Sequence, residues 1–337
     1  MTAYYRPLAQ TGPSRPDGAL PLAGTQAWFT QAERLGRDAA PQIVPASALP
    51  DAVLDHLTRP RADLCGLPLD RARIMGILNV TPDSFSDGGS YDGTDAALRA
   101  AKGMQQSGAD ILDIGGESTR PGAAEVDIAE ETLRTAPVIA ALTDQITAPI
   151  SIDTRKAAVA EAALGAGAQI VNDVSGLTFD ADLAPLCAAR GAPVCVMHSQ
   201  GLPETMQDNP AYGDVLLDVY DFLEGQIATL EALGHSRSQI IVDPGIGFGK
   251  TMAHNIALCQ GLSLFHGLGC ALLLGVSRKG FIGKLGGAAD AAARAPGSIA
   301  LALDACRQGV HILRVHDVDE TRQALALWRA VTEGQTT

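Results

Sequence analysis

Polar side chains follow several short apolar segments of the chain, at the point where each segment ends. Asp153 ends one segment before TRK, Asn172 ends another before DVSG, and Asp243 ends a third before PGIGFGK. Two carboxylates and an amide can accept and donate hydrogen bonds along the edge of a planar, nitrogen-rich ring. Each Asp alone could equally cap a following helix, a common position for Asp, but the three side chains together favour a ligand site.

Cationic and hydroxyl side chains follow other apolar segments. Ser277 and Lys279 belong to SRKG, Arg314 and His316 belong to RVHD, and Arg120 lies in STRPG. The chain has a formal net charge of −13, so a local excess of cations is not a property of its whole surface. The gathering of these side chains therefore indicates a site for an anion such as a phosphate ester.

Eight apolar, β-branched segments carry these residues and predict eight β-strands. They are Ile74–Val80, Asp110–Ile114, Pro149–Ile152, Gln169–Val171, Pro193–Met197, Ile240–Val242, Ala271–Gly275 and His311–Val315. Segments with a helical period lie between them, including Thr94–Ser107, Asp127–Leu142, Lys156–Leu164, Asp214–Leu233 and Ser298–Gln308. Strands that alternate with helices form parallel βαβ units. Eight units over about 260 residues predict an α/β fold, a closed (β/α)8 TIM barrel.

The chemically rich residues come after the predicted strands and rarely after the helices. A barrel of this class builds its active site at the carboxyl ends of the strands, and phosphate often binds at the last two strands. Two nucleotide motifs are excluded, because PGIGFGKT has Pro244 where a P-loop needs Gly and Lys250 where G-x-G-x-x-G needs its last Gly. The chain also lacks a G-x-S-x-G elbow and an H-E-x-x-H zinc helix.

Composition narrows the class of protein further. The chain has 337 residues, of which 46% are hydrophobic and 19% charged, so it can bury a large core. Its acidity argues against a nucleic-acid or membrane-surface partner. Six scattered cysteines without a C-x-x-C pair are typical of buried thiols in a reducing compartment. No apolar run is long enough to span a membrane, and the first residues lack a signal-peptide pattern, so we expect a cytoplasmic protein.

Residues 1–70 differ from the regular pattern that follows, and we expect an N-terminal extension packed on a barrel formed by residues 71–337. Pro and Gly punctuate this stretch, and two short helical patterns occur around Thr25–Leu35 and Pro50–Leu57. Trp28 and Phe29 are candidate anchors on the main domain.

Several blocks of the chain resemble those of the dihydropteroate synthases, a family of pterin-binding enzymes. The blocks are ILNVTPDSFSDGG, DIGGESTRPGA, SIDTRK, NDVSG, MHSQG, IIVDPGIGFGK, GVSRKGFIG and RVHDV. They occur in the family order over residues 73–330. The resemblance implies a transferase of folate biosynthesis that condenses 6-hydroxymethyl-7,8-dihydropterin pyrophosphate with p-aminobenzoate, giving 7,8-dihydropteroate and pyrophosphate. It also implies a TIM barrel, inhibition by sulfonamides, which mimic p-aminobenzoate, and a homodimer formed through outer helices.

The resemblance also assigns a role to each matching residue. The pterin-binding residues it implies are Asp153, Asn172, Met197, Asp243, Phe248 and Lys279. Those implied for p-aminobenzoate are Phe85, Thr119, Arg120, Pro121 and Ser277. Those implied for pyrophosphate are Asn79, Thr119, Arg314 and His316, with Asn79 also placing Mg2+. Asn79, Asp153, Lys279, Arg314 and His316 would then carry the reaction, a dissociative loss of pyrophosphate followed by attack of the amine.

Three other functions fit parts of the pattern. A methyltetrahydrofolate-dependent methyltransferase would share the Asp153, Asn172 and Asp243 grip, but would lack the STRPG and SRKG blocks. A non-catalytic paralogue would bind pterin without needing the loops that carry Phe85 and Arg120. A phosphate-binding barrel isomerase would need a Lys or Glu base inside the barrel, for which Lys279 is the candidate.

Overall fold

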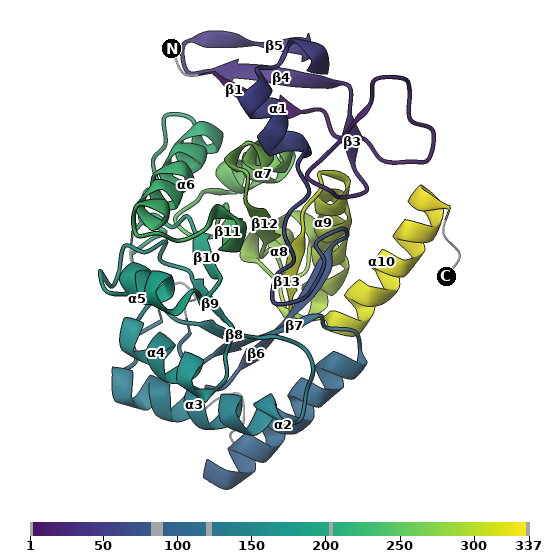
Figure 1. The fold of residues 1–337 in the computed structure, drawn as a ribbon. Helices are drawn as coiled ribbons and strands as arrows, with labels where there is room; N and C mark the ends of the chain where they lie inside the picture. Colours follow the sequence, from purple (N-terminus) through teal and green to yellow (C-terminus); the bar gives the residue numbers. More distant parts are fainter. Residues whose placement is uncertain (1–2, 82–89, 119–122, 202–204, 335–337) are drawn as a thin grey trace.

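The computed structural model describes residues 3–81, 90–118, 123–201 and 205–334. Eight parallel strands form a closed barrel in chain order, and β9 pairs with β10 within the ring. They are β6 (Arg73–Asn79), β7 (Ile111–Gly115), β8 (Ile150–Asp153), β9 (Ile170–Asp173), β10 (Val194–Met197), β11 (Ile240–Asp243), β12 (Ala271–Leu274) and β13 (Ile312–Val315). All eight predicted strands and the predicted (β/α)8 fold are confirmed (Figure 1).

Helices cover the outside of the barrel (Figure 1). They are α2 (Ser90–Gln106), α3 (Ile128–Thr143), α4 (Ala157–Ala166), α5 (Leu183–Arg190), α6 (Val215–Ala232), α7 (Met252–Gln260), α8 (Gly280–Gly286), α9 (Ala295–Arg307) and α10 (Val318–Glu333). Their ends follow local chemistry. Asp127 and Asp214 accept backbone N–H bonds at the starts of α3 and α6, as N-caps do. Gly167 and Gly191 end α4 and α5 with φ of 116° and 60°, a conformation that favours glycine.

The strands bury both of their faces, and side-chain direction alternates along each one. Residues such as Ile74 and Leu112 point outward into a core shared with the helices. Met75, Ile111, Cys195 and the other barrel residues of a second apolar cluster point inward and fill the barrel below its carboxyl-end mouth, toward the amino ends of the strands. A residue at a strand end that is in phase with this inner set therefore faces the lumen.

The N-terminal extension forms its own small sheet, in the order β1–β4–β5, beside a short hairpin and α1. Its elements are β1 (Tyr4–Pro7), β2 (Leu20–Pro21), β3 (Trp28–Phe29), β4 (Gln31–Gly36), β5 (Ala39–Pro45), the 3-10 turn η1 (Ala46–Ala48) and α1 (Asp51–Thr58). The helix predicted around Pro50–Leu57 is confirmed. The helix predicted around Thr25–Leu35 is wrong, because this stretch pairs as strand with β1 and β5 and buries Ala32 and Phe29 in a tertiary core that overrides helix propensity.

The extension touches the barrel mainly at the amino ends of the strands. Leu64 and Leu69 join the inner cluster of barrel residues, and Arg61 donates to the Cys270 carbonyl just before β12. Tyr4 packs with Leu264 in the 3-10 segment η4 (Leu262–Leu268). Trp28 and Phe29 are not the anchors that we expected.

Phe29 is instead buried in the core of the extension itself, and Trp28 donates its indole N–H to the Gly12 carbonyl, also within the extension. Across the described residues, no helix is both long enough and apolar enough to cross a membrane.

Candidate active site

The strand register brings the polar residues of neighbouring strands to one level. Asn79 lies opposite Gly115, Gly115 opposite Asp153, and Asp153 opposite Asn172. All are in phase with the inner set of barrel residues, so their side chains point into the lumen at the carboxyl ends of the strands. Gly115 has no side chain there, and the Asn79 Oδ1 atom lies on its open side. The predicted meeting of Asp153 and Asn172 at one mouth of the barrel is thus confirmed.

Arg314 connects two carboxylates across the lumen. Its Nε donates to Asp113 Oδ2 and its Nη2 to Asp153 Oδ2, both at 2.6 Å. The same Asp113 oxygen accepts from Asn172 Nδ2 at 3.0 Å. One buried carboxylate therefore fixes both a guanidinium and an amide. This bond fixes the orientation of the Asn172 amide, whose carbonyl oxygen can act as an acceptor.

Burial raises the pKa of Asp153 to about 7, although Arg314 opposes the shift and the neighbouring charge of Asp113 adds to it. Asp153 Oδ1 and Asp113 Oδ1 are buried and have no hydrogen-bond partner among the described residues. Buried polar atoms are nearly always paired in folded proteins. These two acceptors therefore suit a ligand that brings N–H donors into the lumen.

Asp243 stands at the end of β11, opposite Met197 of β10. Its Oδ1 accepts the Gly245 N–H at 2.7 Å. Burial raises its pKa, while that hydrogen bond and the charges of Lys279, Lys250 and Arg314 lower it. The Lys279 ammonium lies 4.0 Å from the centre of the Phe248 ring. These contacts place Asp243, Lys279 and Phe248 around one part of the barrel mouth.

Ser277 connects the last two strands. Its Oγ accepts the His316 backbone N–H at 3.1 Å and lies 3.0 Å from His316 Nδ1. Arg278 does not join the gathering of cations that the SRKG block suggested. Its φ of 58° turns the side chain toward Asp317, with which it forms an ion pair.

Two adjacent polar residues at the end of β9 point in opposite directions. Asn172 faces the lumen, whereas the following Asp173 faces outward and accepts the N–H groups of Ser175 and Leu177. Asp173 therefore closes the turn that follows β9, as Asp side chains often do, and does not cap a helix.

His198, which follows Met197 at the end of β10, belongs to a buried cluster with Lys250 and the Phe248 carbonyl. Lys250 Nζ lies 2.9 Å from His198 Nδ1 and donates to the carbonyls of His198 and Phe248, at 3.2 and 2.9 Å. Burial lowers the pKa of Lys250 to about 7 and that of His198 to about 3. Lys250 therefore ties the β10 end to the loop that carries Phe248.

The residues predicted for p-aminobenzoate lie mostly outside the described residues: Phe85, Thr119, Arg120 and Pro121. Asp113, in contrast, is a central residue of the site that the sequence reasoning did not single out. The signal was available, because ILDIG is an otherwise apolar strand with one charged residue at an inward position. A charge at such a position is costly unless it is paired or functional.

Taken together, a barrel whose lumen holds paired carboxylates, an amide and cations at the strand ends is a small-molecule enzyme of the TIM-barrel class. The chain matches the pterin binding enzyme family over residues 75–316. It is 47% identical over 263 residues to the dihydropteroate synthase of Synechocystis sp., covering 77% of this chain and 91% of that protein. It is 45% identical over 264 residues to the dihydropteroate synthase of Escherichia coli, covering 78% and 93%.

Solved structures show the same likeness. The Yersinia pestis dihydropteroate synthase in a sulfonamide drug complex superposes with a TM-score of 0.76 at 44% identity, covering 81% of this chain and 99% of that one. The Xanthomonas albilineans enzyme in complex with 7,8-dihydropteroate gives 0.73 at 42% identity, covering 81% and 98%. The chain belongs to the dihydropteroate synthase family of pterin-binding transferases.

Proposed function

We propose that this protein condenses 6-hydroxymethyl-7,8-dihydropterin pyrophosphate with p-aminobenzoate to 7,8-dihydropteroate and pyrophosphate. The observation that carries the proposal is the set of buried acceptors in the lumen, in which Arg314 donates to Asp113 and Asp153 and Asn172 donates to Asp113. The family relationship identifies the ligand class, since the Xanthomonas albilineans relative was solved with 7,8-dihydropteroate and another structure of that enzyme holds 4-aminobenzoic acid.

The pterin ring offers N–H donors along one edge, and the lumen offers matching acceptors. Asp153 and Asp243 would accept from the ring, and Asn172 would present its carbonyl oxygen. Met197 and Phe248 would line the faces of the ring, and Lys279 would donate to its acceptors. The unpaired Asp153 Oδ1 supports this arrangement, because a bound N–H group would supply its missing partner.

The pyrophosphate would lie beside Asn79, Arg314 and His316. Asn79 offers an amide oxygen at the strand end, and the described residues contain no group of three or more His, Cys, Asp or Glu that could hold a metal. This donor set fits Mg2+ that shares its shell with water and substrate phosphates, as that ion commonly does. When bound, Mg2+ would neutralise charge that develops on the leaving pyrophosphate.

The reaction needs no protein nucleophile. The bond between the exocyclic methylene carbon and the pyrophosphate oxygen breaks, and the electron pair leaves with pyrophosphate. The amine nitrogen of p-aminobenzoate then bonds to the methylene carbon and releases a proton, which pyrophosphate oxygens can accept. Arg314 and His316 would stabilise the leaving group, and Ser277 would hold His316 in place through its Oγ. Phe85, Thr119, Arg120, Pro121 and Ser277 would surround p-aminobenzoate.

Pyrophosphate release tests the proposal directly. The purified protein is incubated with the dihydropterin pyrophosphate and Mg2+, with and without p-aminobenzoate, and 7,8-dihydropteroate is identified by mass spectrometry. We expect release that depends on p-aminobenzoate and yields one dihydropteroate for each pyrophosphate. Tight pterin binding without product would refute the proposal in favour of a non-catalytic paralogue, and methyl transfer from methyltetrahydrofolate would refute it in favour of the methyltransferase.

We also propose that the protein is a cytoplasmic homodimer. All six cysteines are unpaired thiols in the structure, which supports a reducing compartment. Leu285 of α8 and Leu327 and Val331 of α10 are large apolar side chains that are 60%, 66% and 83% exposed, which supports a partner on the outer helices. Sedimentation equilibrium tests this directly. A monomer at micromolar concentration would refute it.

A further inference from the structure

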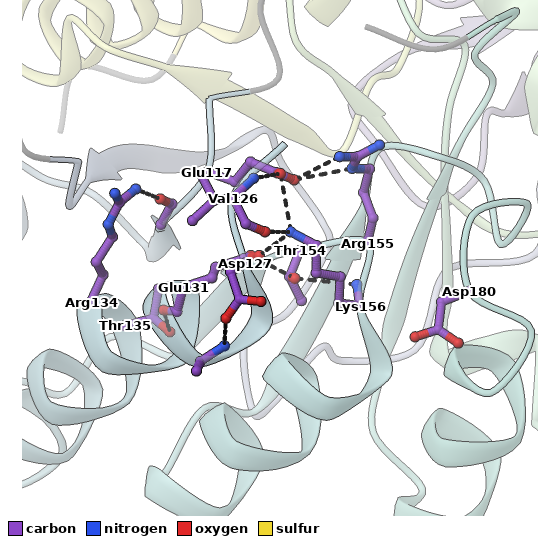
Figure 2. A network of polar contacts seen from close by, with 12 residues as sticks. Glu117, Val126, Asp127, Glu131, Arg134, Thr135, Thr154, Arg155, Lys156 and Asp180 are labelled. Carbon is purple, nitrogen blue, oxygen red and sulfur yellow. Dashed lines mark hydrogen bonds and ion pairs between the residues drawn. The ribbon is translucent and has the colours of Figure 1, made fainter. Parts of the chain in front are cut away.

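A buried ionic cluster lies just beyond the ends of β7 and β8, outside the set of residues discussed so far. It consists of Glu117, Glu131, Arg155 and Lys156, which we call the clasp (Figure 2). Their side chains are 3%, 0%, 6% and 2% exposed. Two carboxylates face two cations, so the cluster as a whole is neutral.

Lys156 is the centre of the clasp. Its Nζ donates to Glu117 Oε1 at 3.0 Å, to Glu131 Oε2 at 2.7 Å and to the Val126 carbonyl at 2.7 Å. All three protons of the ammonium therefore have an acceptor. The same Glu117 oxygen accepts the Val126 N–H at 2.8 Å. Burial would raise the pKa of Glu117, but that hydrogen bond and the cations Lys156 and Arg155 lower it overall.

These contacts hold both ends of one loop. Residues 118–125, which we call loop two, begin directly after Glu117 and end directly before Val126. Lys156 binds both flanking residues, so a single side chain fixes where the loop leaves the barrel and where it returns. Arg155 adds a second hold on Glu117, at 2.9 and 3.1 Å, and packs 4.0 Å from the centre of the Phe179 ring.

Close packing around the clasp leaves it little freedom. A Cβ at Gly116 would come within 2.8 Å of Thr135 Cγ2 in α3, so only glycine lets the β7 end approach this helix closely. Thr154 Oγ1 donates to Glu131 Oε1 at 2.7 Å, and Asp127 caps α3 immediately after Val126 (Figure 2). The base of loop two is therefore held against α3 and the β8 end together.

The clasp is also adjacent in sequence to Asp153, one of the residues proposed to bind the pterin. Thr154, Arg155 and Lys156 follow Asp153 directly, and Asp153 would accept from the pterin ring under the proposed function. Buried ion pairs contribute little net stability compared with apolar residues of the same volume, but they can fix one geometry. The position of this cluster, between Asp153 and loop two, points to geometry as its role.

We propose that Lys156 is a positioning residue that sets the p-aminobenzoate subsite relative to the pterin subsite. It acts by holding Glu117 and Val126, the two ends of loop two, to the end of the strand that carries Asp153. The inference rests on the proposed function, which assigns p-aminobenzoate to residues of this loop. Lys156 itself touches neither substrate.

The test replaces Lys156 in two ways. Lys156→Met removes the ammonium, so the two carboxylates of Glu117 and Glu131 are balanced by a single cation, Arg155, which forms its ion pair with Glu117. The double variant Lys156→Met/Glu131→Gln restores a neutral cluster, with Glu117 still paired to Arg155, so it tests the idea even if the single variant folds poorly. In both, the Val126 carbonyl loses its donor. Tm, the KM for each substrate, and the Kd of 6-hydroxymethylpterin by fluorescence titration are measured.

We expect the double variant to regain Tm but to keep a KM for p-aminobenzoate that is raised by about 10- to 100-fold, since misplacing a binding group by an ångström has effects of this size. The Kd of 6-hydroxymethylpterin should stay unchanged. Arg73→Met is the matched control. Arg73 is a buried cation at the opposite end of the barrel, bound to Pro68 and Asp70, so its loss should lower Tm without changing either KM.

Three results would overturn the inference. One is a double variant with the unmodified protein's KM for p-aminobenzoate. Another is a parallel loss of affinity for both substrates that follows Tm, which would make the clasp structural only. The third is the absence of dihydropteroate formation by the unmodified protein, which would overturn the proposed function first and this inference with it.

Discussion

Asp113→Asn should weaken catalysis without dismantling the site. A single oxygen of Asp113, Oδ2, accepts from both Arg314 Nε and Asn172 Nδ2. An asparagine can place its own carbonyl oxygen at that point and keep both hydrogen bonds, while its NH2 group takes the position of the unpartnered Oδ1. The substitution therefore removes the charge and little of the shape.

The size of the effect follows from this geometry. A hydrogen bond between two charged groups is roughly twice as strong as a neutral one, so replacing the carboxylate by an amide opposite Arg314 costs about 1 to 2 kcal/mol of positioning energy. Arg314 keeps its bond to Asp153, which limits the loss. We expect kcat/KM for the pterin substrate to fall by about 5- to 30-fold.

Initial rates of dihydropteroate formation, with either substrate varied, measure this change. Asp173→Asn is the matched control, because Asp173 is also a buried strand-end carboxylate but faces away from the lumen and accepts from Ser175 and Leu177. It should lower stability and leave kcat/KM unchanged. The reasoning is refuted if Asp113→Asn retains the kcat/KM of the unmodified protein, or if Asp173→Asn loses as much activity.

Three further predictions follow from the buried groups and from one open position. Asp153 has a pKa of about 7, and its ionised form is the better acceptor, so the affinity for 6-hydroxymethylpterin should rise with pH up to about 7 and then level off. Fluorescence titrations from acidic to alkaline pH measure this, and a flat profile would contradict it. Lys250→Met should lower the free energy of unfolding by about 2 to 4 kcal/mol in urea, because the ammonium bridges His198 and Phe248; an unchanged urea midpoint would show that this bridge is dispensable. Gly280→Ser should be tolerated and should raise stability by about 0.5 kcal/mol, because a Cβ there meets no atom within 4 Å; a fall in Tm would indicate a steric conflict.

The barrel could be predicted because each strand carries its own signal. Apolar runs alternated with helical patterns, and polar residues came at the carboxyl ends, so Asp153, Asn172 and Asp243 could be assigned to one mouth before any coordinates. The alternation of side-chain direction along each strand would also have predicted which strand-end residues face the lumen. In β9, Ile170 faces inward, so Asn172 must face inward and Asp173 outward.

Other features depend on information that a sequence carries weakly. Arg278 and Lys279 are adjacent cations, yet the φ of 58° at Arg278 turns one of them toward Asp317. Such a backbone conformation is rare outside glycine. The stretch Thr25–Leu35 has residues that favour helix, but its partners are strands β1 and β5. The clasp could not be predicted because its members, such as Glu117 and Lys156, lie 39 residues apart in the sequence, and local sequence patterns do not report contacts at that separation.

The distribution of charge in the lumen supports heterolysis as the reaction step. Asp113 and Asp153 are carboxyl acceptors near the level where the pterin ring would bind, and Arg314 forms an ion pair with both of them. Under the proposed function, Arg314 and His316 would face the pyrophosphate. In a dissociative reaction, positive charge develops on the pterin side of the breaking bond and negative charge on the pyrophosphate. Carboxylates on the first side and cations on the second stabilise both changes at once, because preorganised charges need no rearrangement as the bond breaks. Under the proposed function, an acidic chain can therefore process an anionic substrate, since the few cations needed would lie at the point where the leaving group forms.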